Sequence, residues 1–176
     1  MGAVVFDLET RRSFQEVGGR GNIHLLGLSV AVTYNEDEDS FHFYTEENVA
    51  ELVEELKKGN PVVGFNLYRF DYPVLQAYTS FPLMSLPTLD ILEEVYRRAG
   101  FKVSLDHLAW ATLGTAKSGD GLMAVHLWRR GRIEELMEYC RRDVEITWQI
   151  YDFGRRNRYI ICYDRKWREL KIPVNW

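Results

Sequence analysis

The stretch VVFDLET, residues 4–10, lies near the beginning of the 176-residue chain and decides how the remainder is interpreted. Its first three residues are apolar, which is typical of a buried β-strand. Asp7 and Glu9 are two residues apart, so on a strand both side chains point to the same face. Two buried like charges cost free energy unless a cation neutralises them. The stretch therefore predicts a strand that ends at a cation-binding site.

Two further acidic residues are placed where they can join this pair. Asp71 follows an apolar run at residues 61–65 and begins a helix, where an aspartate also serves as an N-cap. Asp143 lies on the apolar stripe of a helix expected from residue 133 to about residue 155. An ion pair with the neighbouring arginines is the alternative for that residue. Tyr139 precedes Asp143 by four residues and shares its helical face.

Four carboxylates without histidine or cysteine ligands form an all-oxygen site. Such a site selects Mg²⁺ or Mn²⁺ over Zn²⁺. Four negative charges match two divalent cations, and two metals about 3.5–4 Å apart can drive an in-line phosphoryl displacement. The acidic residues therefore predict two bound divalent metal ions, Mg²⁺ or Mn²⁺.

The rest of the chain predicts an α/β fold. Strands are expected within residues 3–8, 24–34, 41–44 and 61–65, with a closing pair within residues 159–172. Helices are expected over residues 45–59, from residue 71, and over residues 89–99, 104–113, 121–130 and 133–155. Strands that first meander and then alternate with helices favour a mixed central β-sheet flanked by helices, as one domain of residues 1–176.

Composition excludes several classes of protein. Apolar residues make up 46% of the chain and charged residues 27%, which argues against a disordered or fibrous protein. Two cysteines, Cys140 and Cys162, rule out a disulfide framework and fit a reducing compartment. No apolar run approaches the roughly 18 residues of a membrane span. The first residues do not resemble a signal peptide, so we expect a cytoplasmic protein without a membrane partner.

Charge is distributed unevenly along the chain. Residues 1–94 contain 6 Lys and Arg against 16 Asp and Glu, whereas residues 95–176 contain 16 against 10. The basic residues of the second part are mostly arginines, which suit phosphate groups. Two solvated faces of opposite sign are the alternative interpretation. The formal net charge of −4 argues against a protein that simply coats DNA.

Three segments resemble the exonuclease motifs of the DEDD superfamily. VVFDLET (residues 4–10) is similar to the first motif, GFNLYRFDYPVL (residues 64–75) to the second, and YCRRDVEIT (residues 139–147) to the third in its Tyr-x-x-x-Asp form. The resemblance implies a ribonuclease H-like fold and 3′→5′ exonuclease activity of the tyrosine subclass (DEDDy). KSGDGLMAVHLW (residues 117–128) and PVNW (residues 173–176) show a looser similarity to ribonuclease H-like domains associated with helicases.

The resemblance also implies a role for each catalytic residue. Asp7 is expected to bridge both metals, and Glu9 and Asp143 to complete the tighter site. Asp71 is expected to hold the second metal. Tyr139 is expected to orient the attacking water by a hydrogen bond, while the metal lowers the pKa of that water.

Six residues are expected to bind substrate. Aromatic faces commonly hold an unstacked terminal nucleotide, which suits Tyr68 and Phe70, although Phe70 fits a core position equally well. Asn66 either holds the turn between strand and helix or contacts the scissile nucleotide. Thr10 can offer its backbone N–H to the terminal 3′ hydroxyl, and Lys117 either binds a phosphate or belongs to a solvated turn. The full set is Leu8, Thr10, Asn66, Tyr68, Phe70 and Lys117.

Tryptophan and histidine residues often have functional roles, but in this chain we expect structural or surface positions for them. Trp110, Trp128 and Trp148 occur at helical spacings suited to packing, so we expect them in the core. Structural or surface positions are expected for the histidines, which are His24, His42, His107 and His126.

These observations predict a metal-dependent 3′→5′ exonuclease that acts on the single-stranded 3′ ends of DNA or RNA, in DNA repair or RNA processing. It would release nucleoside 5′-monophosphates, alone or beside a helicase or polymerase. One alternative is a catalytically silent module that binds nucleic acid or a protein partner. Another is a ribonuclease H-like endonuclease, in which the acids follow a different order. The choice between DNA and RNA stays open, as does the oligomeric state.

Overall fold

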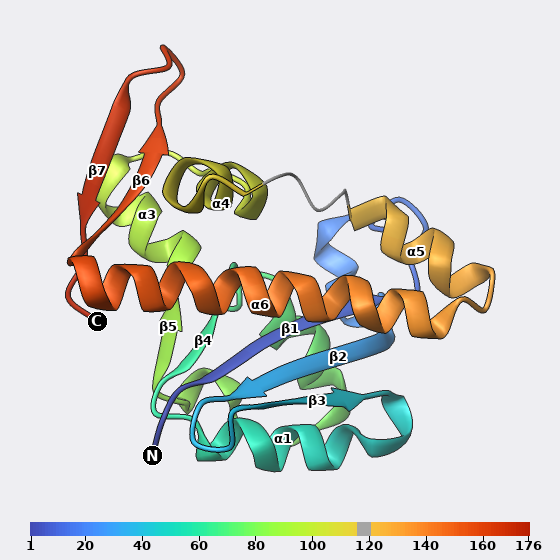
Figure 1. The fold of residues 1–176 in the computed structure, drawn as a ribbon. Helices are drawn as coiled ribbons and strands as arrows, with labels where there is room; N and C mark the ends of the chain where they lie inside the picture. Colours follow the sequence, from blue (N-terminus) through green and yellow to red (C-terminus); the bar gives the residue numbers. More distant parts are fainter. Residues whose placement is uncertain (116–120) are drawn as a thin grey trace.

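A five-stranded mixed sheet lies at the centre of the computed structural model, which describes residues 1–115 and 121–176 (Figure 1). Its strands are β1 (Val4–Thr10), β2 (Leu28–Asn35), β3 (Ser40–Tyr44), β4 (Val62–Gly64) and β5 (Thr88–Asp90). The order is β3-β2-β1-β4-β5, in which β1 and β2 are antiparallel, as are β2 and β3, while β1, β4 and β5 are parallel. The predicted α/β fold is therefore confirmed.

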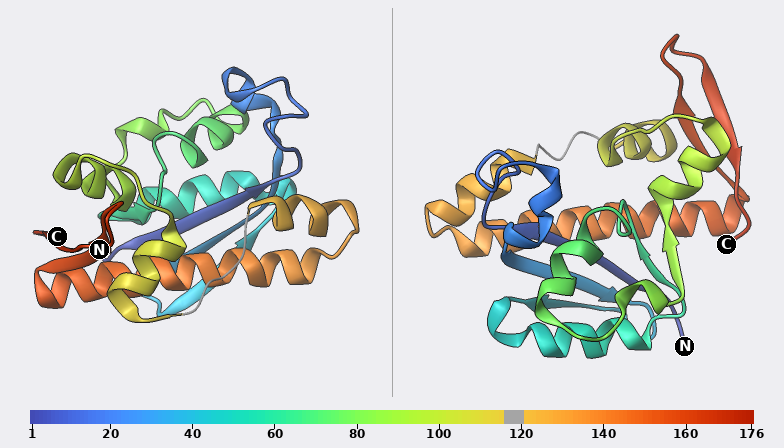
Figure 2. Two further views of the ribbon diagram at one scale, coloured as in Figure 1. Left: turned by 90° about the horizontal axis from the view of Figure 1, so that it is seen from above. Right: turned by 180° about the vertical axis from the view of Figure 1, so that it is seen from behind.

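Helices cover both faces of the sheet. The α-helices are α1 (Val49–Lys58), α2 (Asp71–Leu75), α3 (Ile91–Ala99), α4 (Leu105–Leu113), α5 (Gly121–Arg129) and α6 (Ile133–Asn157). Within residues 1–115 and 121–176 there are also four short 3₁₀ helices: η1 (Arg20–Leu25), η2 (Glu46–Asn48), η3 (Gln76–Tyr78) and η4 (Leu83–Ser85). Helix α6 crosses one face, and α1 lies on the opposite face, as the views from above and from behind also show (Figure 2). Among the described residues, no helix is both long and apolar enough to cross a membrane.

Alternate side chains of β1 enter two separate apolar clusters. Val5 packs in the cluster formed with α3, α4, α5 and α6. Val4, Phe6 and Leu8 pack in the cluster formed with α1 and α2. Because side chains alternate along a strand, this arrangement directs Asp7 and the residues that share its face toward α6.

Most of the expected elements are present, although several begin or end at other residues. The strand expected from residue 24 begins at Leu28, because η1 occupies the preceding residues and Gly27 turns the chain at a φ of +72°. The helix expected over residues 89–99 begins at Ile91. The residues before it pair with β4 as strand β5, and Asp90 caps the helix.

The closing pair of strands forms its own two-stranded antiparallel sheet. Strand β6 (Tyr159–Tyr163) pairs with β7 (Glu169–Pro173), and the hairpin projects from the main body above α4 (Figure 1). Trp128 and Trp148, which were expected in the core, are partly buried and pack against the edge of the cluster that includes α6. The expectation that Trp110 is a core residue is wrong: this side chain is 48% exposed, because the hairpin covers only part of α4.

Candidate active site

Strand β1 and helix α6 bring three carboxylates together. Oxygen atoms of Asp7, Glu9 and Asp143 all lie within 4.8 Å of one another. The two β1 residues share a face because they are two positions apart, and α6 crosses that face. Asp143 is directed inward because Val144, its neighbour, and Cys140, almost one turn earlier, are fully buried against the sheet.

Asp71 supplies a fourth carboxylate from the start of α2, which follows the strand β4 that pairs with β1. It is 2% exposed, and its Oδ1 accepts the backbone N–H of Leu8 at 3.1 Å, which fixes the carboxylate against β1. The N-cap of α2 is Phe70, and the cap position makes no side-chain hydrogen bond. The interpretation of Asp71 as the helix cap is therefore wrong, since its carboxylate is bound to the strand that carries Asp7.

The four acids repel one another in a buried setting. Burial raises the pKa of Asp7 well above its ordinary value, and the charges of Asp71, Glu9 and Asp143 add to the shift. Burial likewise raises the pKa of Glu9 and that of Asp71. Within the described part of the chain, no lysine or arginine forms an ion pair with Asp7, Glu9 or Asp71. An all-oxygen donor set of four closely placed carboxylates fits hard divalent cations such as Mg²⁺ or Mn²⁺.

Tyr139 lies beside the cluster on α6, one turn before Asp143. Burial raises the pKa of its hydroxyl far above the ordinary value, and the charges of Glu9, Asp143 and Asp7 raise it further. The hydroxyl therefore stays protonated at neutral pH. It can hydrogen-bond to a water or to a substrate oxygen, but it is not a general base.

Cys140 contacts the cluster, although sequence analysis assigned it no role there. Its buried thiol lies 3.4 Å from both the backbone oxygen and Oδ2 of Asp7, to which it can donate a weak hydrogen bond. Burial raises the pKa of this thiol well above its ordinary value, so it remains neutral. A signal was present in the sequence, because Cys140 lies on the same apolar stripe of α6, three residues before Asp143.

Asp90 is a second residue that sequence analysis missed. It is 4% exposed and caps α3 by accepting the N–H groups of Leu92 and Glu93 at 3.1 and 3.3 Å. The same carboxylate accepts the N–H of Asn66 at 2.9 Å and that of Tyr68 at 3.1 Å. Asp90 therefore holds the turn that leads from β4 to Asp71. The available signal was an aspartate near the start of an expected helix.

The expected substrate residues occupy different environments. Thr10 and Phe70 both line a cavity of about 430 Å³ with Phe14, whose ring meets that of Phe70 edge-on at a centroid distance of 6.0 Å. The side chain of Leu8 is buried in the opposite layer, so only its backbone lies near the acids. Lys117 lies outside the described residues.

Two further candidates belong to the turn before α2. Asn66 has a left-handed φ of +70° at the turn itself, where its carbonyl accepts the N–H of Phe70 at 3.0 Å. Tyr68 packs edge-on against Tyr72, with its hydroxyl 3.4 Å from the carbonyl of Thr88. The structure therefore does not bring Tyr68 to the cavity that Thr10 and Phe70 share.

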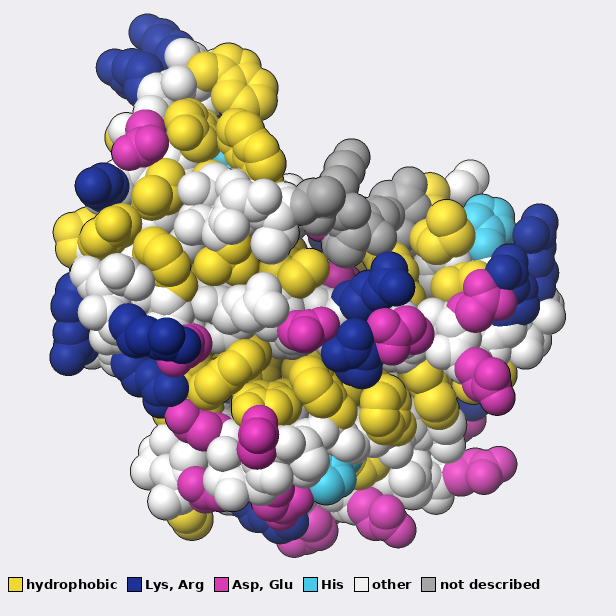
Figure 3. Space-filling model, viewed as in Figure 1, with side chains coloured by type: hydrophobic (Ala, Val, Ile, Leu, Met, Phe, Trp, Pro, Cys, Tyr) yellow, Lys and Arg dark blue, Asp and Glu magenta, His cyan; other side chains and the backbone are white. Residues whose placement is uncertain are grey.

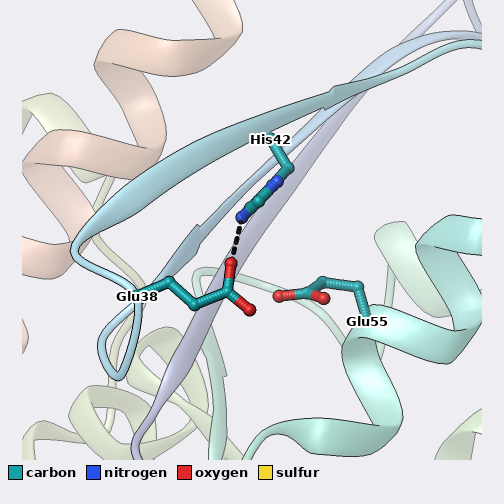
Figure 4. Close-up of side chains that lie close together, drawn as sticks. All are labelled: Glu38, His42 and Glu55. Carbon is teal, nitrogen blue, oxygen red and sulfur yellow. Dashed lines mark hydrogen bonds and ion pairs between the residues drawn. The ribbon is translucent and has the colours of Figure 1, made fainter.

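A second group of potential metal ligands lies at the opposite layer, between β3 and α1 (Figure 4). It contains Glu38, His42 and Glu55, with His42 Nε2 2.8 Å from Glu38 Oε2. Lys58 Nζ lies 2.7 Å from Glu55 Oε2, and Asn35 donates to Glu55 Oε1 at 2.7 Å. Burial alone would raise the pKa of Glu55, but these two partners lower it below its ordinary value. The chain itself thus compensates this charge, and we assign no metal here.

Replacement of Asp90 tests its part in holding the site. We expect Asp90→Ala to lower the free energy of unfolding by about 2–4 kcal/mol, because it removes a helix cap and leaves buried N–H groups without an acceptor. Asp90→Asn should cost less, since its amide oxygen can still accept. Urea denaturation measures both. The control Glu93→Ala loses a surface ion pair with Arg69 and should change stability by less than about 1 kcal/mol. Equal effects of Asp90→Ala and Glu93→Ala would contradict this role.

The acidic cluster also predicts how stability depends on pH. Carboxylates whose pKa is raised in the folded state bind more protons there than in the unfolded chain. The free energy of unfolding of metal-free protein should therefore fall as pH rises above about 4, by up to about 1.4 kcal/mol per pH unit for each such acid. Urea titrations in EDTA measure this slope. Asp7→Asn should reduce it, and an unchanged slope in that variant would contradict the proposed repulsion.

Comparison with known proteins gives the family. The family model RNase_H_2, described as RNase_H superfamily, matches residues 4–153. A family B DNA polymerase from the hyperthermophilic archaeon Pyrobaculum calidifontis has a similar fold, with a TM-score of 0.64 and 14% identity over 86% of this chain. The aligned region is 24% of that polymerase chain. No curated protein matches the sequence. With the family model matching most of its length, the chain belongs to the RNase_H superfamily.

Proposed function

We propose that this chain is a metal-dependent 3′→5′ exonuclease of the DEDDy type. It hydrolyses phosphodiester bonds at single-stranded 3′ ends of DNA or RNA and releases nucleoside 5′-monophosphates. The observation that carries this proposal is the convergence of Asp7, Glu9 and Asp143 within 4.8 Å, with Asp71 fixed against the same strand. Similarity to a DNA polymerase supports nucleic acid as the substrate.

The four carboxylates would hold two divalent ions, Mg²⁺ or Mn²⁺. Such ions supply Lewis acidity, which lowers the pKa of a water and stabilises the leaving oxygen of an in-line displacement. Asp7 is central because it is close to Glu9 and Asp143 and also feels the charge of Asp71. Asp7 would therefore be the central ligand, with Glu9 and Asp143 beside it and Asp71 as the fourth carboxylate that would help to hold the ions.

Tyr139 positions the attacking water in this proposal. Its hydroxyl is neutral at physiological pH because burial and the nearby acids raise its pKa. A neutral hydroxyl can accept from and donate to a water, so it can hold that water in line with the scissile bond. It does not need to remove a proton.

The terminal nucleotide is assigned to the cavity lined by Thr10 and Phe70. Phe70 and Phe14 give this cavity an aromatic wall, which suits an unstacked base. Thr10 comes directly after Glu9, so its backbone N–H is suited to bind the terminal 3′ hydroxyl. Contacts of substrate with Leu8, Asn66, Tyr68 and Lys117 remain predictions. A polymerase or helicase that supplies frayed 3′ ends would suit this activity as a partner, and the chain could equally act alone.

Product analysis tests the proposed activity. The protein is incubated with 5′-labelled single-stranded DNA and RNA of one sequence, in Mn²⁺, Mg²⁺ or EDTA. We expect a metal-dependent ladder that shortens from the 3′ end. Asp143→Asn should slow cleavage at least about a hundredfold with the fold intact, because an essential charge at the reaction centre is lost.

Glu38→Gln provides the matched control, since it removes a carboxylate from the other acidic group and should cleave like the wild type. Internal fragments would indicate an endonuclease. Binding of both strands without products would indicate a catalytically silent module, and full activity of Asp143→Asn would contradict the assigned site.

Tyr139→Phe tests the positioning of the water. We expect the cleavage rate to fall by up to about a hundredfold, because only the geometry of the attack is impaired. The Mn²⁺ affinity and the pH dependence of the rate should match the wild type. Single-turnover rates and calorimetric metal titrations measure these quantities. A wild-type rate would overturn the assignment, and a shifted pH profile would indicate that Tyr139 transfers a proton.

A further inference from the structure

The projecting β6–β7 hairpin and helix α4 together display an aromatic surface. We define this aromatic surface as Trp110 on α4, Tyr163 at the end of β6 and Trp167 in the following turn. The ring centroids of Trp110 and Tyr163 are 5.2 Å apart, and those of Trp167 lie 6.2 and 6.3 Å from the other two. Trp110 is 48% exposed and Trp167 is 72% exposed. Large aromatic side chains gathered in the open commonly mark a binding surface.

The turn between the strands holds Trp167 in this exposed position. Its φ of +58° is uncommon for a bulky residue. Asp164 Oδ1 accepts the N–H groups of Lys166 and Arg168 at 2.8 and 3.0 Å, and the carbonyl of Asp164 accepts the N–H of Trp167 at 3.0 Å. The indole is therefore fixed outward beside Trp110 by an ordered turn.

Basic residues surround the exposed indole. Arg165, Lys166 and Arg168 are exposed on either side of Trp167, and Arg168 forms an ion pair with Asp164 at 2.7 Å. Across residues 1–115 and 121–176, no carboxylate forms an ion pair with Arg165 or Lys166. Figure 3 shows basic side chains at the tip of the hairpin and hydrophobic side chains below them. Aromatic faces beside uncompensated positive charge complement the bases and phosphates of a single strand.

Helix α4 fixes the position of the hairpin. The N–H of Tyr163 donates to His107 Nε2 at 3.0 Å. The hydroxyl of Thr112 donates to the carbonyl of Ile161 at 2.8 Å and accepts the N–H of the same residue at 3.0 Å. These bonds join the two elements along their length, so the aromatic surface has a defined position relative to α4.

The same helix links the aromatic surface to the candidate active site. Helix α4 packs against α6, and the charge of Asp106 contributes to the raised pKa of Tyr139. Asp106 and Trp110 are four residues apart and therefore share a helical face. This face of α4 therefore extends from the neighbourhood of Tyr139 toward the aromatic surface.

We propose that Trp110, Tyr163 and Trp167, together with Arg165 and Lys166, form a second binding site for single-stranded nucleic acid. This site stacks bases and binds phosphates of the strand on the 5′ side of the nucleotide that is cleaved. The direction of the strand rests on the proposed 3′→5′ exonuclease function, whereas the binding itself does not.

Binding measured in EDTA tests this site without cleavage. A 5′-labelled oligonucleotide of about 20 nucleotides, longer than common single-strand sites, is titrated as DNA and as RNA by fluorescence anisotropy. We expect Trp167→Ala to raise the Kd about fivefold or more, because a base loses its stacking partner. The log of the binding constant falls as the log of the salt concentration rises. In the double variant Arg165→Ala, Lys166→Ala this fall should be less steep, by about 0.7 for each lost phosphate contact.

Two matched controls separate this surface from nonspecific effects. Phe43→Ala removes an exposed aromatic ring from β3, and Arg97→Ala removes an exposed arginine from α3. Both should bind like the wild type. With metal added, Trp167→Ala should raise KM for the long strand more than KM for a trinucleotide, since the shorter strand has fewer nucleotides to place on the aromatic surface.

Wild-type affinity of both hairpin variants would overturn the proposal, whether or not the protein is an exonuclease. Altered self-association of these variants, with unchanged oligonucleotide binding, would also overturn it and would indicate a protein partner. Loss of binding in a protein that never cleaves would support the second site and contradict only the proposed enzymatic function.

Discussion

Mutual repulsion among closely placed carboxylates is the constraint on which the candidate site depends. Asp7, Glu9 and Asp71 are held by the central strand and by a hydrogen bond to it, and Asp143 is held by the helix across it. Strand β1 pairs with β4 at Val4 and Val5 and with β2 along its length, so the backbone that carries Asp7 and Glu9 is fixed in the sheet. Burial raises the pKa of Asp7, Glu9 and Asp71, and the neighbouring acids raise those of Asp7 and Glu9 further. Such a set of carboxylates could bind divalent cations.

Helix α6 connects the core, the acids and the proposed strand-binding surface. Leu136, Cys140 and Val144 bury its inner stripe against the sheet, while Tyr139 and Asp143 face the site from neighbouring positions. Helix α4 packs against it and carries the hairpin. Chemistry and substrate positioning would therefore depend on the same packed layer, and the opposite layer of α1 and α2 serves mainly to hold β1 and Asp71.

The parts of the site that were predictable from the sequence depend on short spacings. The two-residue interval of Asp7 and Glu9 and the four-residue interval of Tyr139 and Asp143 are fixed by strand and helix geometry. Apolar runs marked the strands and apolar stripes marked the helices, so the α/β fold was also predictable. Asp71 was correctly expected near a helix start, but its bond to Leu8 spans 63 residues and has no signature in the local sequence.

Features that depend on long-range packing were not predictable in this way. Asp90 binds the N–H of Asn66 across 24 residues, so its local pattern shows only a helix cap. Trp110 has a helical spacing typical of a core residue, yet its exposure depends on where the β6–β7 hairpin lies. Glu38, His42 and Glu55 come together only when β3 meets α1, and Lys58 then compensates their charge.

Anomalous diffraction from crystals soaked in Mn²⁺ tests the central claim most directly, because it locates each ion without requiring turnover. The account predicts two Mn²⁺ ions about 3.5–4 Å apart, bound by Asp7, Glu9, Asp71 and Asp143. Absence of Mn²⁺ from these four carboxylates would contradict the account. Mn²⁺ bound only by Glu38, His42 and Glu55 would instead place the metal site between β3 and α1.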